Sequence, residues 1–453
     1  MASVSTSTVP GQHPAFRHTV TDFESLTSLS SLSSVDANRA KPTHDRLLDT
    51  YGNEFTPPDF TIKDIRDAIP KHCFERSTFK GYIYILRDII CLVTTFTIFY
   101  NFVTPGYFPS TPVRALLWGL YTTLQGLFGT SLWVIAHECG HQAFSESRLV
   151  LHSALLVPYF SWKISHGKHH KATGNMERDM VFVPCTREQH ATRIGRIAYE
   201  LSELTEETPT YTLLRLVMKQ LVGWPSYILT NVTGHNYHEC QGEGRGKGKK
   251  NGLGGGVNHF DPRSPIYEAK QAKLIILSDI GIRIAIAALV YLSNTFGWTN
   301  MLVWYGIPYL WVNHWLVAIT FLQHTNPMLP HYTADEWNFV RGAAATIDRD
   351  MGFIGRHLLH GIIETHVLHH YVSTIPFYNA DEALKAIRPV MGDHYRTDTK
   401  DGAWGFIRAL WISARMCQWV EPSAEAEGAS KGILFFCNHN GLGTKPVVLR
   451  KPE

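Results

Sequence analysis

The stretch ALLWGLYTTLQGLFGTSLWVIA, residues 115–136, decides the class of this protein, and the motif HECGH, residues 137–141, follows it directly. The stretch contains no Asp, Glu, Lys, Arg or His, and as a helix it is long enough to cross the ~30 Å hydrocarbon layer of a membrane. Residues 301–323 form a second run of this kind, interrupted only by His314. The sequence therefore predicts an integral membrane protein.

Two weaker candidate spans precede these runs, at residues 82–103 and 274–296, and each contains one acidic and one basic residue. If the chain crosses the membrane four times, both termini and the long link between the second and third spans lie on the same side of the membrane. That link is rich in Lys and Arg, whereas the short links near residues 104–112 and 297–300 contain neither. The positive-inside rule then predicts that the long link and both termini face the cytosol.

The segments around these spans complete the expected domain organisation. We expect one membrane domain at residues 50–420, between a disordered Ser/Thr-rich cytosolic tail at 1–49 and a polar cytosolic tail at 421–453. The apolar stretch 212–232 is interrupted by Arg215, Lys219 and Pro225, which favours an interfacial helix over a fifth span. The stretch 241–256, QGEGRGKGKKNGLGGG, is typical of a flexible linker.

The composition is ordinary except for histidine. The chain has 453 residues with 42 Lys+Arg against 39 Asp+Glu, which excludes a highly charged disordered protein and predicts no nucleic-acid partner. Its seven cysteines form no C-x-x-C pair, which disfavours a disulfide scaffold or a thiolate zinc cluster. Histidine, with 24 residues, is the unusual feature.

The histidines gather in three clusters, HECGH at 137–141, HGKHH at 166–170 and HVLHH at 366–370. At this composition the pattern H-x-x-H-H is expected only about 0.07 times by chance, yet it occurs twice. Positions i, i+3 and i+4 share one face of a helix, so each cluster can direct two or three imidazoles at one point. All three clusters fall on the same predicted side of the membrane.

Convergent neutral imidazoles suit Fe, Zn or Cu, and eight of them are too many for one ion, so the clusters predict two metal ions. The predicted ligands are His137, His141, His166, His169, His170, His366, His369 and His370, with His324 at the end of the fourth span as a ninth candidate. Nearby polar groups should orient these rings. The candidates are Glu138, Asn175, Glu177, Asp179, Asp348, Asp350 and Glu364, of which Asp179 and Asp350 are preferred.

Two other classes of protein remain open from the first cluster and the membrane spans. HECGH contains the H-E-x-x-H signature of a zinc metalloprotease, here at the end of a membrane span, but that reading leaves both H-x-x-H-H clusters unexplained. A metal transporter would have its ligands near the middle of the membrane, whereas these clusters follow the spans. The position of the clusters fits an open cytosolic metal site that receives its substrate from the bilayer better than it fits a transporter.

Four segments of the chain resemble the membrane-bound fatty acyl desaturases, most closely the fungal Δ12 (oleate) desaturases and their hydroxylase relatives. They are HECGHQAF, SHGKHHKATGNMERDMVFVP, FLQHTNPMLPHY and ETHVLHHYVSTIPFYNADEA. The likeness extends over residues 47–422 and implies a four-span all-α membrane fold with a cytosolic helical cap. One departure is the link between His141 and His166, which is shorter than the family pattern after Val150.

The resemblance also implies a chemistry and its partners. It implies a non-haem diiron site on the eight clustered histidines and His324, O2 as co-substrate, and electrons from NADH through cytochrome b5 and its reductase. It implies a multi-pass protein of the endoplasmic reticulum, while a homodimer stays open. In related enzymes an asparagine one turn before the additional histidine holds a water on one iron, and here that position is Thr320.

The expected reaction is Δ12 desaturation, the conversion of oleoyl to linoleoyl chains on a phospholipid or on CoA. A fatty acid 12-hydroxylase and a Δ15 or bifunctional desaturase share the same site and are the alternatives. No residue of the sequence separates these outcomes by physical argument.

Overall fold

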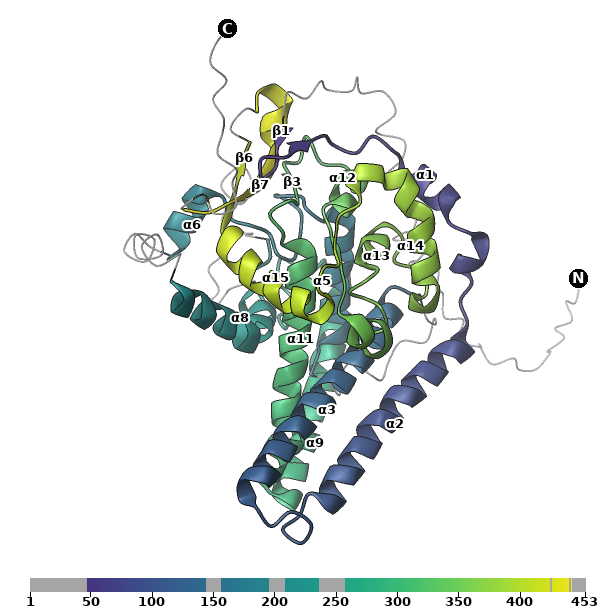
Figure 1. The fold of residues 1–453 in the computed structure, drawn as a ribbon, viewed down its shortest axis with the longest axis vertical. Helices are drawn as coiled ribbons and strands as arrows, with labels where there is room; N and C mark the ends of the chain where they lie inside the picture. Colours follow the sequence, from purple (N-terminus) through teal and green to yellow (C-terminus); the bar gives the residue numbers. More distant parts are fainter. Residues whose placement is uncertain are drawn as a thin grey trace, which may run out of the picture. The chain divides into compact units, whose positions relative to one another are not determined.

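A computed structural model describes residues 47–143, 156–194, 208–235, 257–423, 426–439 and 441. Most of the predicted N-terminal tail, the Gly/Lys-rich stretch 241–256 and the shortened link after Ala143 lie outside the described residues. The described part is mostly helical, and it belongs to one of the two compact units of the chain (Figure 1).

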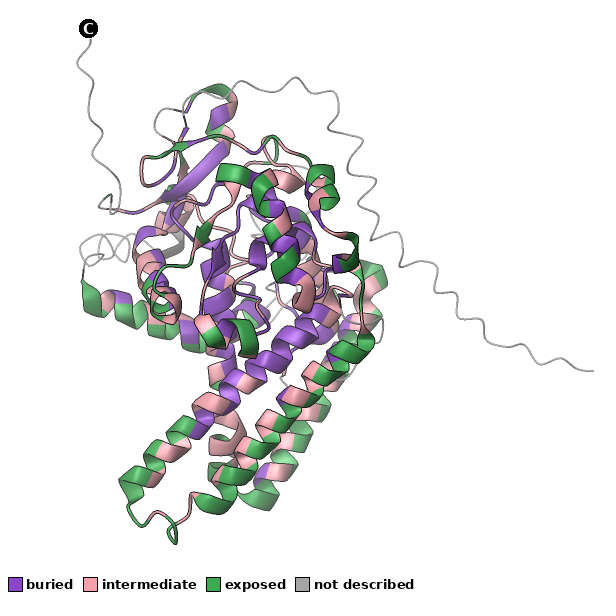
Figure 2. Cartoon of the chain, turned by 45° about the vertical axis from the view of Figure 1, so that its right-hand side comes forward, coloured by how far each residue is buried: buried purple, intermediate pink, exposed green. Residues whose placement is uncertain are grey.

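Two helices in the described part are long and apolar enough to cross a membrane, by length and composition. They are α2, Thr78–Phe102, and the helical stretch Ala269–Phe296, which contains α9, Ala272–Phe296. Both expose large apolar side chains along much of their length, among them Leu86 and Ile284 (Figure 2). They correspond to the two weaker spans of the sequence analysis.

The two stronger runs form helices that are more deeply enclosed by protein. Residues 115–136 lie in α3, Thr111–Gly140, which packs between α2 and α11, Ile307–His324. The short helix α10, Trp298–Met301, and a π-helical turn, Leu302–Gly306, lead into α11. Gly126 and Gly129 of α3 lie against Trp311 and Val312 of α11, where a Cβ would collide. Small residues therefore let the two backbones approach.

Asp88, the acidic residue of α2, is buried and paired. Asp88 is only 1% exposed, and its carboxylate accepts hydrogen bonds from Arg87 at 2.6 Å and from the Ser131 hydroxyl at 2.7 Å. The Nε2 atom of His360 lies 2.9 Å from the same carboxylate. A carboxylate in a candidate membrane helix is thus fully partnered, as buried charges require.

Shorter helices surround the end of α3 and α11 that carries histidine. They are α1 (Ile62–Ala68), α5 (Tyr159–Ala172), α6 (Arg187–Ile194), α8 (Pro209–Thr230), α12 (Phe339–Ala344), α13 (His366–Tyr371), α14 (Phe377–Met391) and α15 (Gly402–Met416). The largest buried core joins Trp133 and Trp162 to residues of α8, α11 and α15. Most buried residues lie here, whereas the opposite ends of the long helices are exposed (Figure 2).

Small sheets depart from the all-α expectation. β3 (His331–Tyr332), β7 (Ile433–Cys437) and β6 (Trp419–Pro422) form an antiparallel sheet with β7 in the centre. The apolar stretch within the predicted C-terminal tail is therefore a buried strand, and residues 421–437 pack on the domain as far as they are described. Two-residue strands form the pairs β1 (Leu47–Leu48) with β2 (Glu54–Phe55) and β4 (Asp348–Arg349) with β5 (Thr397–Asp398).

Candidate metal centre

Four helices bring the predicted histidines to one place. The first cluster ends α3, the second occupies α5, the third forms α13, and His324 is the last residue of α11. His141 and His166 are partly buried and the other seven are buried. Segments that are far apart in the sequence thus supply one buried imidazole cluster.

The imidazoles form two groups. In each group, the ligand nitrogens lie within 4.8 Å of one another. The first group contains His137, His141, His166, His170 and His369, and the second contains His169, His324 and His370. The Nε2 atom of His366 lies 3.0 Å from that of His324, which places His366 beside the second group. The structure therefore brings together all nine histidines, in the two sets that a dimetal site needs.

The nitrogen separations fit metal binding. The Nε2 atom of His166 lies 2.9 Å from that of His137 and 3.1 Å from that of His170, and His169 and His324 approach to 3.3 Å through the same atoms. Two nitrogens bonded at right angles to one ion, each at ~2.1 Å, lie about 3.0 Å apart. Imidazole nitrogens in each group therefore lie close enough together to bind one ion.

The charge state and the free nitrogens of the histidines agree with metal binding. Burial, followed by repulsion from neighbouring imidazoles, lowers the pKa of His166, His170 and His366 well below the usual value, so these rings are neutral. The Nε2 atoms of His369 and His370 are buried without a hydrogen-bond partner in the described part of the chain. Buried polar atoms normally have partners, and a bound metal ion would supply one here.

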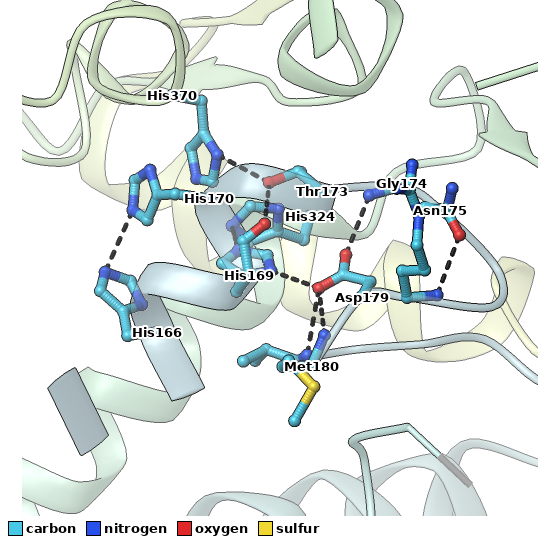
Figure 3. Close-up of polar contacts among 12 residues, drawn as sticks. His166, His169, His170, Thr173, Gly174, Asn175, Asp179, Met180, His324 and His370 are labelled. Atoms are coloured by element: carbon cyan, nitrogen blue, oxygen red, sulfur yellow. Dashed lines mark hydrogen bonds and ion pairs between the residues drawn. The ribbon is translucent and has the colours of Figure 1, made fainter. Parts of the chain in front are cut away.

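Asp179 contacts the second group through His169. Its Oδ1 atom lies 2.6 Å from Nδ1 of His169 and also accepts a hydrogen bond from the Met180 amide at 2.6 Å (Figure 3). Its Oδ2 atom accepts from the Gly174 amide at 2.9 Å. These bonds fix both the carboxylate and the ring, so the Nε2 atom of His169 is directed at His324.

Glu138 adjoins the first group. Its Oε1 atom lies 3.2 Å from Nδ1 of His137 and 3.7 Å from Nδ1 of His369, and the side chain is buried. The carboxylate thus lies within ion-pair distance of two rings of this group, without a hydrogen bond to either of them in the described part of the chain.

Asp350 and Thr320 contact none of the histidines through a hydrogen bond or ion pair in the described part of the chain, although Thr320 lines the cavity beside them. In the described part of the chain, Asp350 accepts from the Gly352 amide and pairs with Arg356 rather than with a histidine. Thr320 donates to the Leu316 carbonyl at 2.7 Å, one turn back along α11.

Asp348 holds the third cluster instead of Asp350. It is buried, accepts from the Val367 amide at 2.8 Å and from the Tyr395 hydroxyl at 2.7 Å, and so anchors the first turn of α13. Burial raises the pKa of Asp348 to about 7.

Two polar residues near the histidines were missed from the sequence. The Thr173 hydroxyl lies 3.0 Å from Nδ1 of His370 and donates to the His169 carbonyl (Figure 3). The Gln323 amide donates to the carbonyls of Ile362 and Ile363, which fixes the chain ahead of the third cluster. No spacing links these residues in the sequence, although Thr173 follows His169 by one helical turn.

A cavity adjoins the histidines. Its wall is mainly aromatic and aliphatic and includes five of the histidines, His137, His166, His169, His324 and His366. Pockets with such a wall and a few polar groups are typical sites for apolar ligands. An apolar chain in the cavity would contact the metal centre directly.

Comparison with known proteins agrees with the sequence and the geometry. A family model described as fatty acid desaturase matches residues 114–241 and 251–401, and a second, described as a domain of unknown function (DUF3474), matches residues 28–96. The oleate hydroxylase FAH12 of Claviceps purpurea is 71% identical over 433 residues, which cover 94% of this chain and 91% of that protein.

More distant relatives carry both activities. The Delta(12) fatty acid desaturase of Mortierella alpina is 40% identical, with 91% of this chain and 97% of that protein covered. The oleoyl-12-hydroxylase FAH12 of Ricinus communis is also 40% identical, with 84% and 92% covered. The chain therefore belongs to the fatty acid desaturase family, in the group that contains fungal Δ12 desaturases and oleate hydroxylases.

Proposed function

We propose that this protein is an oleate 12-hydroxylase, an oxidoreductase that places a hydroxyl group on carbon 12 of an oleoyl chain. The observation that carries the choice is the 71% identity to the oleate hydroxylase of Claviceps purpurea, against 40% to the Δ12 desaturase of Mortierella alpina. The similarity thus favours hydroxylation over the desaturation that the sequence analysis placed first. Δ12 desaturation is the second candidate, because the desaturase matches across nearly the whole chain.

The nine histidines would hold two iron ions, divided between the two groups described above. The chemistry that bound iron supplies is activation of O2 for attack on an unactivated methylene, which no amino-acid side chain performs. Hydroxylation consumes one O2, two electrons and two protons, and leaves the hydroxylated chain and one water. Asp179, Glu138 and Thr173 would keep the imidazoles oriented during this chemistry.

The cavity would bind the acyl chain. Trp133, Trp162 and Phe182 line it together with Leu316, and these side chains offer a chain of methylenes apolar contact. The shape of this wall would decide which carbon faces the metal centre, because methylenes carry no polar group for recognition. The enclosed site would also exclude bulk water.

The same proposal implies how the protein lies in the membrane and where it receives electrons. The domain of residues 50–420 would cross the membrane four times, through α2, α3, α9 and the segment from α10 to α11, in the endoplasmic reticulum. The metal centre and both termini would face the cytosol, where cytochrome b5 and its reductase deliver electrons from NADH. The exposed apolar face of α8 supports an interfacial position for that helix.

Expression in yeast tests the proposal. Gas chromatography of the fatty acids should show 12-hydroxyoleate as the main new product, whereas linoleate alone would establish the desaturase. His369→Ala should abolish the product because it removes a metal ligand, and the exposed His357→Ala serves as the matched control. Metal analysis of the purified protein should find iron, and one zinc per chain without iron would contradict the site.

A further inference from the structure

Three metal-ligating side chains meet outside the nine-histidine centre, where the segment ahead of α2 lies against α14. They are His72 and Cys73, from the short 3-10 helix Lys71–Phe74, and Glu382 of α14. One ligand atom from each lies within 4.8 Å of those from the other two. An imidazole, a thiol and a carboxylate from distant parts of the sequence are therefore brought to one point.

The three side chains face one another through a single ring nitrogen. The Nε2 atom of His72 lies 2.9 Å from the Glu382 carboxylate and 3.7 Å from Sγ of Cys73. As an N–H group this nitrogen donates to the carboxylate, and as a bare nitrogen it accepts from the thiol, so hydrogen bonding accounts for only one of the two contacts at a time. A metal ion at the centre would bond to all three ligand atoms at once.

The separations of the ligand atoms fit a tetrahedral zinc ion. Bonds of ~2.3 Å to sulfur and ~2.1 Å to nitrogen, at the tetrahedral angle, place these two atoms about 3.6 Å apart. The Cys73 and His72 atoms are 3.7 Å apart. The His72 and Glu382 atoms lie closer than the about 3.4 Å of nitrogen and oxygen ligands on one such ion. The Glu382 side chain can withdraw by this small amount because it is 59% exposed.

We propose that His72, Cys73 and Glu382 bind one zinc ion, separate from the two irons of the histidine centre. A thiolate with an imidazole and a carboxylate is a zinc ligand set, and the thiolate disfavours Mg²⁺ and Ca²⁺. The thiol releases its proton to solvent on binding, and the thiolate and carboxylate then balance the two charges of the ion. The fourth position is left to a water molecule. This site goes beyond the proposed function and does not depend on which fatty acid product forms.

The ion would connect two parts of the chain that support the third histidine cluster. Cys73 is fully buried, in a core that also contains residues of α1, α13 and α14. Asn379 of α14 donates to the Cys73 carbonyl at 3.2 Å, and the Ser77 amide donates to the Tyr378 hydroxyl at 2.7 Å. Zinc would add a stronger link at the same junction. It would thus hold the segment that leads into α2 against α14, and through their common core it would brace α13.

Cobalt substitution in the purified full-length protein tests the site. A thiolate bound to Co²⁺ absorbs in the near ultraviolet, and a centre made of imidazoles lacks this sulfur-to-metal band. Wild-type protein with added Co²⁺ should show the band, and Cys73→Ser should lose it. Cys139→Ser, which removes the cysteine inside the first histidine cluster, should keep it. Absence of the band from the wild type, or an unchanged band in Cys73→Ser, would refute the proposal.

Zinc content provides a second test, which stands even if Cys73→Ser does not fold. Metal analysis should find one zinc per chain fewer in His72→Ala and in Glu382→Gln than in the wild type, with equal iron. Glu75→Gln, at an exposed position in the same segment, is the matched control and should keep the wild-type zinc content. Added zinc should raise the Tm of the wild type and of this control, but not that of Glu382→Gln, because an ion that binds only the folded state stabilises it.

A simple ion pair between His72 and Glu382 predicts a different result. Glu382→Gln would then lower the Tm while its zinc content stayed equal to that of the wild type. That outcome would overturn the zinc site and leave the iron centre and the proposed function as they are.

Discussion

Replacement of Asp179 by Asn tests whether this carboxylate determines metal binding. Asp179 is 5% exposed and accepts hydrogen bonds from Nδ1 of His169 and from the amides of Gly174, Met180 and Val181. Asparagine has nearly the same shape but only one acceptor oxygen, and its amino group donates. One of the two sides of the carboxylate must therefore lose its bond in the variant.

The magnitude depends on which side loses its acceptor. If the amino group faces Gly174, a buried amide donor is left unpaired, which costs about 1–3 kcal/mol of folding stability. If it faces His169, the ring loses the acceptor that fixes its orientation, and partners of this kind contribute about 10–100-fold to metal affinity or activity. We expect Asp179→Asn to bind iron tenfold to hundredfold more weakly than the wild type. We also expect a lower free energy of unfolding.

Iron titration of the purified protein, monitored by metal analysis after dialysis, measures this change. Asp350→Asn is the matched control, because Asp350 pairs with Arg356 and makes no contact with a histidine in the described part of the chain. Iron affinity should be unchanged in the control. Wild-type iron affinity and product yield in Asp179→Asn would refute the orienting role.

Three further predictions concern packing, buried charge and metal removal. Gly126→Ala should destabilise the protein by about 1–3 kcal/mol because its Cβ collides with Trp311. Gly119→Ala is the control, because Gly119 has open space around it. Equal Tm values for the two variants would contradict the packing of α3 on α11. Asp88→Asn should cost about 1–3 kcal/mol because it removes a buried acceptor shared by Arg87, Ser131 and His360, seen as a loss of folded protein in detergent. Chelation should lower the Tm of the iron-loaded wild type but not that of His369→Ala, since ligands that bind only the folded state stabilise it.

The membrane spans show what the sequence can and cannot reveal. Residues 115–136 and 301–323 are the stronger candidate spans because they lack acidic and basic side chains, apart from His314. Among the described residues, however, α2 and the helical stretch ending in α9 are the two that are long and apolar enough to cross a membrane. Uncharged polar residues such as Gln125 and Asn313 lower the mean hydropathy of α3 and α11. Both residues are buried among protein neighbours, which is why these helices tolerate them.

The parts of the candidate site that depend on the spacing of nearby residues could be predicted from the sequence. Spacing at i, i+3 and i+4 identified the histidine clusters, and the structure gathers all of them with His324. The supporting residues depend on contacts between distant segments. Asp348 and Asp350 lie two residues apart in one short strand region, and only the folded chain shows that Asp348 accepts from the third cluster while Asp350 pairs outward.

The position of strand β7 in the sequence determines when part of the fold is completed during synthesis. β7 pairs with β3, and Tyr332 of β3 exchanges backbone hydrogen bonds with Gly174 and Met176, in the loop that leads from the second histidine cluster to Asp179. Chains emerge from the ribosome N-terminus first, at about 5–20 residues per second. This loop therefore gains its final support only when residues 433–437 have been synthesised. A message truncated shortly before that point would yield all nine candidate histidines but leave β3, and with it the loop before Asp179, without the strand that pairs with it.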